Sequence, residues 1–274
     1  MKFFDSHCHL QFDAFNDLRD QIISDIVESN SKVINVGSSI ENSRSGTLLS
    51  KKYPNNLYSS IGIHPVHSLG FSVYEDKEEA EKDMIKYPQD LNLLREMIDE
   101  NVKAIGECGI DFSYLKDSIG DVENLKQKQI DCFKFQIELA KEFSLPLILH
   151  VCKEYMMALE ILNELNFKNK AVFHFFKGKY FDFEEILRNS NYYFSFSNVI
   201  LYDNSMDKVV YDVPIDRLMI ETDGPYVPPI SKKGEINEPK NVFYVAEKIS
   251  KIKGMKIEEI LDISYNNGLK FFNI

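Results

Sequence analysis

The sequence lacks any apolar run long enough to cross a membrane, since no stretch of about 18 uninterrupted apolar residues occurs in it. It also lacks a secretory signal pattern, because Asp5, His7 and His9 interrupt the apolar start at Phe3 and Phe4. These two absences predict a cytoplasmic protein that has no membrane partner.

Cysteine is scarce, and the four cysteines never form a CxxC pair. They are Cys8, Cys108, Cys132 and Cys152. In a chain without a secretory signal, such residues are expected to be reduced thiols rather than disulfides. The missing CxxC spacing also argues against a structural zinc knuckle.

Positive charge is in short supply. The chain has 32 Lys and Arg residues against 43 Asp and Glu residues, so its formal net charge is −11. This balance argues against a protein that holds long nucleic acid through a basic surface. It does not exclude a nuclease, because metal ions in a cleft can supply the positive charge that the surface lacks.

No low-complexity segment or composition break marks a linker, so residues 1–274 are expected to form a single domain. Short β-rich runs alternate with longer segments of helical spacing, a pattern typical of βαβ units and a parallel sheet. The expected strands are 2–7, 33–37, 57–63, 102–107, 146–150, 171–175, 192–196 and 217–221.

Helices are expected between these strands and after the last one. The clearest covers 122–143, with Ile130, Phe133, Ile137 and Ala140 on one stripe. The others are 18–29, a helix ending near 53, 75–86, 91–100, 154–165, 183–189, 206–211, 242–253 and 257–271. Eight strand–helix units in a chain near the usual ~250 residues predict an α/β fold, a (β/α)₈ TIM barrel with C-terminal helices. An open doubly wound sheet is the alternative, which periodicity alone does not exclude.

Histidines and carboxylates lie at the ends of the predicted strands or just after them. They are His7, His9, His64, Glu107, His150, His174 and Asp223. In a (β/α)₈ barrel the C-terminal ends of all strands meet at one face, where the active site is found. A single histidine there is more often an ordinary polar residue, and a single carboxylate is often a helix N-cap. The joint pattern favours a metal site.

His7 and His9 are two residues apart in a strand, so both imidazoles point to the same side and Cys8 points toward the helix layer. Mixed imidazole and carboxylate ligands suit Zn²⁺, Mn²⁺ or Fe²⁺ and tolerate Mg²⁺. Both imidazoles can bind one ion. Single histidine and carboxylate ligands from opposite strands would complete two adjacent sites.

Longer motifs surround these residues. They are Asp5-Ser6-His7-Cys8-His9-Leu10, Gly62-Ile63-His64-Pro65, Gly106-Glu107-Cys108-Gly109-Ile110-Asp111, Leu145-Pro146-Leu147-Ile148-Leu149-His150, His174-Phe175-Phe176-Lys177-Gly178, Glu221-Thr222-Asp223-Gly224-Pro225-Tyr226 and Asn237-Glu238-Pro239. With these motifs the chain resembles, over nearly its whole length, the TatD family of metal-dependent deoxyribonucleases, a branch of the amidohydrolase-like barrels.

The resemblance implies roles for six residues. His7, His9 and Asp223 would bind one divalent ion, His150 and His174 a second, and Glu107 would bridge the two. The ions would be Zn²⁺, Mg²⁺ or Mn²⁺. The implied reaction is hydrolysis of DNA phosphodiester bonds, as a 3′→5′ exonuclease on single-stranded ends, by a water activated between two metals. Asp223 would orient this water and accept its proton, with Glu107 as the second catalytic residue. A monomer is favoured.

The chain departs from the family pattern in its positive charges. Cys152 and Ile236 stand where the family often has arginine, whereas Lys177 replaces a small residue. Lys177 is therefore expected to contact the substrate, as a point charge rather than a bidentate guanidinium. His64 is expected to contact substrate or phosphate; the alternative is a hydrogen bond to the turn at Pro65.

Two other functions stay open. The lost arginines and the negative charge also suit a metal hydrolase of a small phosphoester or amide. A binding protein that has lost catalysis fits less well, because all six ligand candidates are present.

Overall fold

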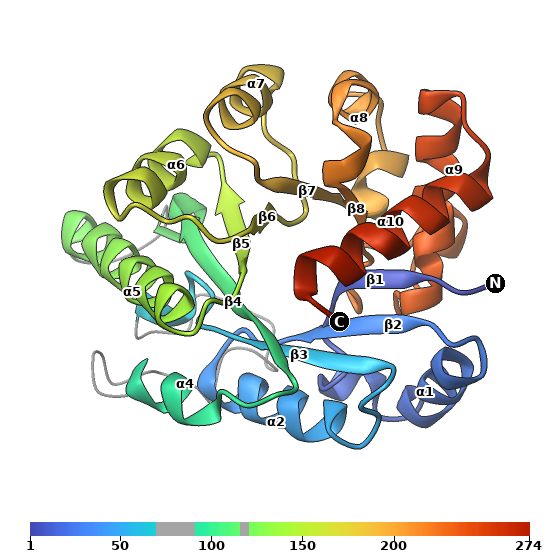
Figure 1. The fold of residues 1–274 in the computed structure, drawn as a ribbon, viewed down its shortest axis with the longest axis horizontal. Coiled ribbons are helices and arrows are strands. Elements are labelled where there is room, and N and C mark those ends of the chain that lie inside the picture. The colour runs from blue at the N-terminus through green and yellow to red at the C-terminus, as the bar shows by residue number, and fades with distance from the viewer. Residues whose placement is uncertain (70–90, 116–120) are drawn as a thin grey trace.

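Eight parallel strands form a barrel that is ringed by helices in the computed structural model, which describes residues 1–69, 91–115 and 121–274 (Figure 1). The strands lie side by side in chain order. They are β1 (Phe4–Cys8), β2 (Lys32–Val36), β3 (Leu57–Ile61), β4 (Val102–Asp111), β5 (Leu147–Cys152), β6 (Ala171–Phe173), β7 (Tyr193–Phe196) and β8 (Leu218–Ile220). The predicted (β/α)₈ architecture is confirmed.

The barrel closes between its first and last strands. Three residues after β8, the Asp223 N–H donates to the carbonyl of His7 over 2.8 Å. The His9 N–H donates to the carbonyl of Gly224, also over 2.8 Å. An open doubly wound sheet would leave these backbone groups unpaired, so this alternative is wrong. The closure also brings Asp223 beside the two histidines of β1.

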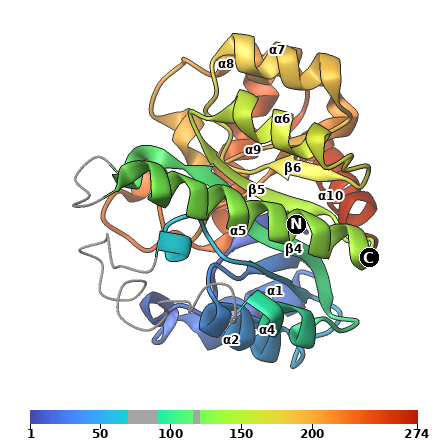
Figure 2. The same cartoon turned by 90° about the vertical axis from the view of Figure 1, so that its left-hand side faces the viewer.

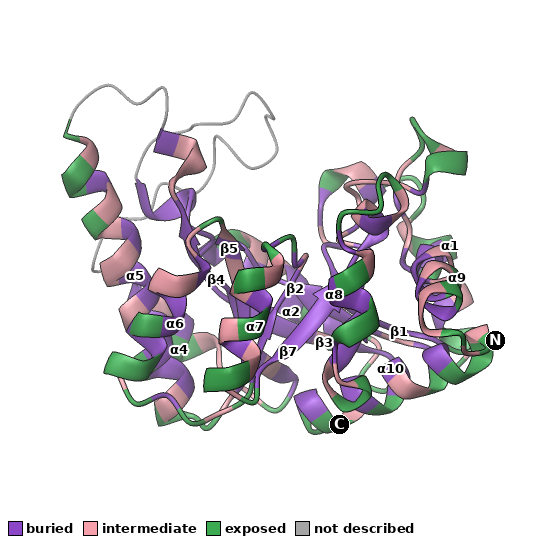
Figure 3. Ribbon diagram, turned by 90° about the horizontal axis from the view of Figure 1, so that it is seen from above, coloured by how far each residue is buried: buried purple, intermediate pink, exposed green. Residues whose placement is uncertain are grey.

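Helices cover the outside of the barrel, with exposed residues on their outer faces (Figures 2 and 3). They are α1 (Arg19–Glu28), α2 (Ile40–Ser50), α4 (Leu91–Met97), α5 (Val122–Glu142), α6 (Tyr155–Glu164), α7 (Tyr180–Asn189), α8 (Asp207–Asp212), α9 (Val242–Lys253) and α10 (Ile257–Phe272). The helix predicted at 75–86 lies outside the described residues. Within the described ranges, no helix is long and apolar enough to cross a membrane.

The predicted buried stripe of α5 is correct except at Ile130, which is only half-buried. Two glutamines on this helix are instead fully buried. Gln129 accepts from the Asp111 N–H and donates to the Asp111 carbonyl, and Gln136 makes the same pair of bonds with Ile63. A buried side-chain amide can accept from the N–H and donate to the carbonyl of one backbone residue. These two glutamines therefore hold the segment after β3 and the end of β4 in place.

An apolar cluster fills the N-terminal end of the barrel. Phe4 from β1 and Met219 from β8 pack there with Phe271 and Phe272 of α10. Figure 1 shows α10 crossing this end of the strands. A Cβ on Gly268 would lie 2.7 Å from the Phe4 ring, so α10 approaches the barrel this closely only because that residue has no side chain. The functional groups are consequently confined to the other end.

Two β-bulges turn the predicted ligands inward. In β1, Asp5 lies opposite Val33 and Cys8 lies opposite Asn35. Three residue steps along β1 therefore pair with two residue steps along β2, so β1 contains one extra residue. Phe4 therefore faces the barrel interior, whereas Cys8 faces the helix layer, although strict alternation would place both on one side. The extra residue moves His7 and His9 to the interior face.

β4 has the same irregularity. Ile105 lies opposite Leu147 and Cys108 opposite Leu149, which moves Glu107 to the interior. The prediction that this strand ends at residue 107 is wrong, because pairing with β5 continues to Asp111. The pairing can continue because Gly109 has no side chain. A Cβ at this position would lie only 2.0 Å from the His150 carbonyl oxygen and would clash with it.

Candidate metal centre

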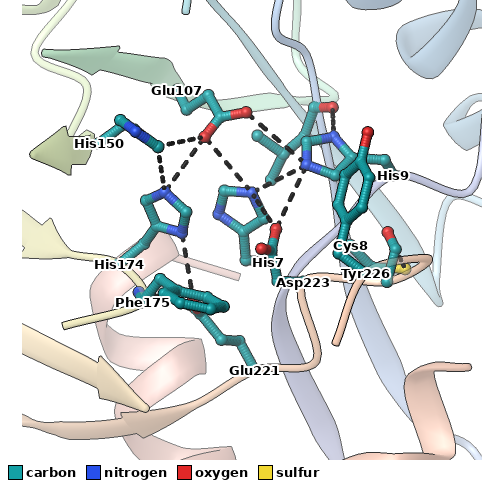
Figure 4. A network of polar contacts seen from close by, with 12 residues as sticks. His7, Cys8, His9, Glu107, His150, His174, Phe175, Glu221, Asp223 and Tyr226 are labelled. Carbon is teal, nitrogen blue, oxygen red and sulfur yellow. Dashed lines mark hydrogen bonds and ion pairs between the residues drawn. The ribbon is translucent and has the colours of Figure 1, made fainter. Parts of the chain in front are cut away.

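All six predicted ligands meet at the C-terminal end of the barrel (Figure 4). β1 carries His7 and ends next to His9, while β4 carries Glu107 and β5 carries His150. His174 follows β6 directly, and Asp223 lies three residues after β8. The structure thus brings together side chains that are separated by up to 216 residues, as the strand-end argument predicted.

The Glu107 carboxylate lies at the centre of this cluster. Its Oε1 is 3.7 Å from His9 Nε2, whereas its Oε2 is 3.1 Å from His174 Nε2 and 3.5 Å from His150 Nδ1. His7 Nε2 lies 3.8 Å from Oε2. Oε1 therefore faces His9, whereas Oε2 faces His150 and His174 and also lies near His7, and the strands that carry these residues divide the cluster into two groups.

The first group, called here the β1–β8 half, consists of His7, His9 and Asp223. The Nε2 atoms of the two histidines are 3.1 Å apart, and they lie 3.4 and 3.5 Å from Asp223 Oδ1. His9 Nδ1 lies 2.9 Å from the carbonyl oxygen of Val36. Only a ring N–H can donate to a carbonyl, so Nδ1 carries the proton and the Nε2 lone pair faces the cluster.

The second group, the β5–β6 half, consists of His150 and His174. His150 Nδ1 lies 3.2 Å from His174 Nε2. Their outer nitrogens each face a carboxylate: His150 Nε2 is 3.3 Å from Asp111 Oδ2, and His174 Nδ1 is 3.3 Å from Glu221 Oε1. A carboxylate that accepts from the outer N–H fixes the ring orientation and leaves the inner nitrogen free to bind.

Asp111 and Glu221 contact the predicted ligands His150 and His174, although the sequence did not point to these contacts. Both stand in motifs that carry the family resemblance, yet neither received a role. The available signal was their place: Asp111 ends β4, and Glu221 follows β8 directly. Which imidazole each carboxylate faces depends on contacts between different strands, so spacing alone did not reveal it.

The two halves differ in the acidity of their histidines. Burial, together with the nearby His174 imidazole, lowers the pKa of His7 well below its ordinary value. Burial acts in the same direction on His174, but hydrogen bonds to Glu107 and Glu221 outweigh it and raise the pKa of His174 well above its ordinary value. The pKa of His150 is raised as well, because hydrogen bonds to Asp111 and Glu107 outweigh its burial.

These residues fit divalent cations. Burial would raise the pKa of Glu107, but hydrogen bonds from His150 and His174 hold it well below its ordinary value, so the buried carboxylate is charged. Among the described residues, neither Glu107 nor Asp223 forms an ion pair with a lysine or arginine. A buried charge of this kind requires a compensating partner, and inward-facing imidazole lone pairs are ligands for a cation.

Among the described residues, three groups have ligand atoms that lie within 4.8 Å of one another: His7 with His9 and Glu107, His7 with His174 and Asp223, and His64 with Glu107 and His150. The last group places His64 at the centre, with its ring 4.1 Å from the His150 ring. His64 Nδ1 also accepts from the Val66 N–H over 3.1 Å. The hydrogen bond to the turn, which was the alternative expectation for His64, is therefore present. His64 also lies next to the predicted ligand His150.

A cleft of about 660 Å³ opens beside the β5–β6 half. It is lined by Asp111, His150, Val151, Cys152, Lys153, Tyr155, His174, Phe175, Lys177, Gly178, Lys179 and Asp182. Lys177 therefore lines this cleft, and its contact with substrate stays a prediction. Cys152 lies in the cleft at a position where the family often has arginine. Ile236, the other position where the family often has arginine, is not among its lining residues.

Solved structures of known proteins share this fold. A TatD family hydrolase from Entamoeba histolytica superposes with a TM-score of 0.80 at 24% identity, over 99% of this chain and 98% of that one. A TatD homologue from Escherichia coli gives the same score and identity, with the same shares of the two chains covered. At this identity the likeness establishes the barrel architecture.

Sequence comparison is more specific. The chain is 32% identical, over 99% of its length and 97% of the relative, to an uncharacterized metal-dependent hydrolase of Methanocaldococcus jannaschii. It is 30% identical, over 98% of its length and 93% of the relative, to the human deoxyribonuclease TATDN3. The family model described as TatD related DNase matches residues 4–273. The predicted resemblance is confirmed, and the chain belongs to the TatD family of metal-dependent hydrolases.

Proposed function

We propose that the protein is a deoxyribonuclease that hydrolyses DNA phosphodiester bonds with two divalent ions, as Zn²⁺, Mg²⁺ or Mn²⁺. The observation that carries this proposal is the position of Glu107. Its Oε1 faces His9 and its Oε2 faces His150 and His174, so one carboxylate can serve two ion sites. His7, His9 and Asp223 would hold one ion, and His150 and His174 the other. The human relative named a deoxyribonuclease supports DNA as the substrate.

Two ions bound here would lower the pKa of a water molecule and neutralise charge that develops on the phosphoryl oxygens. The side chains of the chain supply orientation and proton transfer. Asp223 Oδ1 lies within 3.5 Å of both His7 Nε2 and His9 Nε2, and the Asp223 side chain is 15% exposed. Its carboxylate would orient the attacking water and accept the proton that this water loses.

The proposed substrate is a single-stranded DNA end, cut in the 3′→5′ direction. The cleft volume of about 660 Å³ is that of a small-molecule pocket, which suits a terminal nucleotide better than a duplex. Lys177 would contact a phosphate in this cleft, and His64, beside His150, would contact substrate at the inner end.

The test is an assay of single-stranded DNA that carries a label at the 5′ or the 3′ end, combined with elemental analysis of the purified protein. We expect a ladder from the 3′ end, about two bound ions per chain, and loss of cleavage in His7→Ala and Glu107→Ala. Exposed Glu96→Ala serves as the matched control. Bound metal without cleavage of any DNA would overturn the proposal.

A second candidate is hydrolysis of a small phosphoester or amide. The observation that favours it is the cleft itself, which has Cys152 in place of a guanidinium and lies on a chain with a net charge of −11. Metal-loaded protein that cleaves small phosphoesters or amides but leaves DNA intact would support this candidate.

A further inference from the structure

We infer that the Phe175 ring is the stacking surface for a nucleobase of the substrate, beside the metal centre, with Lys177 placed to meet an adjacent phosphate. This inference rests on the proposed function, because it names how that same site would hold a single-stranded nucleotide. Its occupant is the base of the nucleotide next to the scissile phosphate.

Phe175 occupies a backbone conformation that aromatic residues rarely adopt. Its φ is 46°, in the left-handed region, which is unfavourable for a bulky side chain. The surrounding structure holds it there, because the Phe175 N–H donates to Glu221 Oε1 over 2.7 Å. Glu221 is fully buried and also faces His174 Nδ1, so one carboxylate positions both the predicted metal ligand and the phenyl ring.

The unusual conformation sends three consecutive side chains in three directions. His174 points to Glu107, and Phe176 is fully buried against Tyr155 and Phe194. Phe175, between them, is half-buried and lines the cleft. Figure 4 shows its ring beside His174, from which its centroid is 6.3 Å away. An aromatic ring kept at the wall of an open cleft, rather than in the core, presents a surface for a planar ligand.

The charges around this ring suit a nucleotide. Lys177 Nζ lies 5.8 Å from the centroid of the Phe175 ring, and Lys153 and Lys179 also line the cleft. The two carboxylates of the cleft are already engaged: Asp111 faces His150, and Asp182 accepts from the Lys179 N–H over 2.8 Å. The lysine ammonium groups could bind a phosphate while the apolar ring stacks on the adjoining base, as a nucleotide requires.

Other aromatic residues near the centre are less suited to this role. Phe112 packs against the core, and Tyr114 packs beside His64 with ring centroids 5.7 Å apart. Tyr226 lies on the opposite side, beside His9, and is not among the residues that line the cleft (Figure 4). Phe175 alone of these four lines the cleft that reaches the predicted ligands.

The absence of tryptophan from the sequence allows a direct test. Phe175→Trp places a single indole at the wall of the cleft, so its emission reports what contacts that wall. We expect thymidine 5′-monophosphate, added to the metal-loaded protein, to change this emission, and deoxyribose 5-phosphate, which has no base, to leave it unchanged. Equal responses to both ligands, or no response to either, would overturn the inference.

Phe175→Ala measures the same contact by calorimetry without a fluorophore. It should bind thymidine 5′-monophosphate about tenfold more weakly than the unchanged protein, as expected when one stacked base loses its ring. Binding of deoxyribose 5-phosphate should not change. Phe181→Ala, which removes a 61% exposed ring of α7 outside the cleft, is the matched control. Equal weakening for both ligands would indicate a merely structural role and contradict stacking.

The two proposals fail in different ways. If the unchanged protein cleaves DNA but Phe175→Ala binds both ligands normally, the nuclease stands and the stacking surface is wrong. If the base-dependent binding is present but no phosphodiester is hydrolysed, the stacking surface stands and the deoxyribonuclease proposal is wrong.

Discussion

The two halves of the histidine cluster orient their imidazoles in different ways. In the β1–β8 half, the outer nitrogen of His9 faces a backbone carbonyl, and the pKa of His7 is lowered by burial. In the β5–β6 half, the outer nitrogens face the carboxylates of Asp111 and Glu221, and the pKa of His174 is raised. A carboxylate partner makes an imidazole a more basic ligand, but it also makes the proton a stronger competitor for the same nitrogen.

The largest effect should come from the residue that joins the halves. We expect Glu107→Gln to lower kcat about 10³-fold, because it removes several kcal/mol of metal-dependent stabilisation. It should also weaken metal binding in both halves, since Oε1 and Oε2 face different imidazoles. Elemental analysis and initial rates measure both effects, with the exposed Glu96→Gln as control. Two retained ions and a normal rate would show that Glu107 does not bridge.

Single substitutions in each half should separate the two ion sites. His9→Gln removes a ligand of the β1–β8 half and His150→Gln a ligand of the β5–β6 half, and each should lower kcat about 10²-fold. Each variant should retain about one ion per chain, counted after dialysis. Loss of both ions in either variant would mean that the halves form one indivisible site.

Removing the orienting carboxylates should affect one half only. Glu221→Gln and Asp111→Asn are expected to weaken binding of the ion in the β5–β6 half about 10- to 100-fold, the usual effect of losing such a partner. The ion in the β1–β8 half should keep its affinity. Metal titration by calorimetry tests this, with exposed Asp216→Asn as control. Equal weakening of both ions would contradict the division into halves.

The pH dependence of ion binding should also differ between the two halves. The pKa of His174 lies above its ordinary 6.5 in the metal-free protein, and an imidazolium cannot bind a cation. Falling pH should therefore weaken the ion in the β5–β6 half by up to about tenfold per pH unit below that raised pKa. The β1–β8 half, with the lowered pKa of His7, should keep its ion to lower pH. Simultaneous loss of both ions on acidification would contradict this difference.

The raised pKa of His174 also affects the stability of the metal-free fold. Here low pH stabilises the protein, whereas low pH weakens metal binding. Because the folded pKa of His174 exceeds 6.5, its protonation stabilises the folded state fully below that value. The contribution is lost as pH rises through the raised folded pKa. The pH dependence of the unfolding free energy in chelator should show this trend, and it should be weaker in Glu221→Gln.

The smallest effect should come from the cleft beyond the β5–β6 half. Lys177 is exposed, so its contact with a phosphate is worth roughly 0.5–1 kcal/mol, and Lys177→Ala should raise KM about two- to fivefold. The value of kcat should change little, because this lysine does not reach the ligands. The control is Lys168→Ala, an exposed lysine outside the cleft. An unchanged KM would remove Lys177 from the substrate site.

Much of the fold could be predicted from the sequence. The alternation of β-rich runs and helical segments gave eight strands in order, and polar residues at the ends of those strands marked the functional face. Boundaries were less predictable at β4, which was expected to end at residue 107 but continues to Asp111 because Gly109 permits close pairing with His150. A glycine has the same letter whether it ends a strand or allows a neighbour to approach.

The sequence by itself determined which side chains gather at the C-terminal end of the barrel, because every strand of a parallel barrel ends there. Only the tertiary structure decided how they face one another. The bulges in β1 and β4 turn His7, His9 and Glu107 inward, against the strict alternation that the sequence implies. Contacts between different strands set Asp111 against His150, and Glu221 against both His174 and Phe175. Such contacts depend on register and closure, which no local pattern of residues specifies.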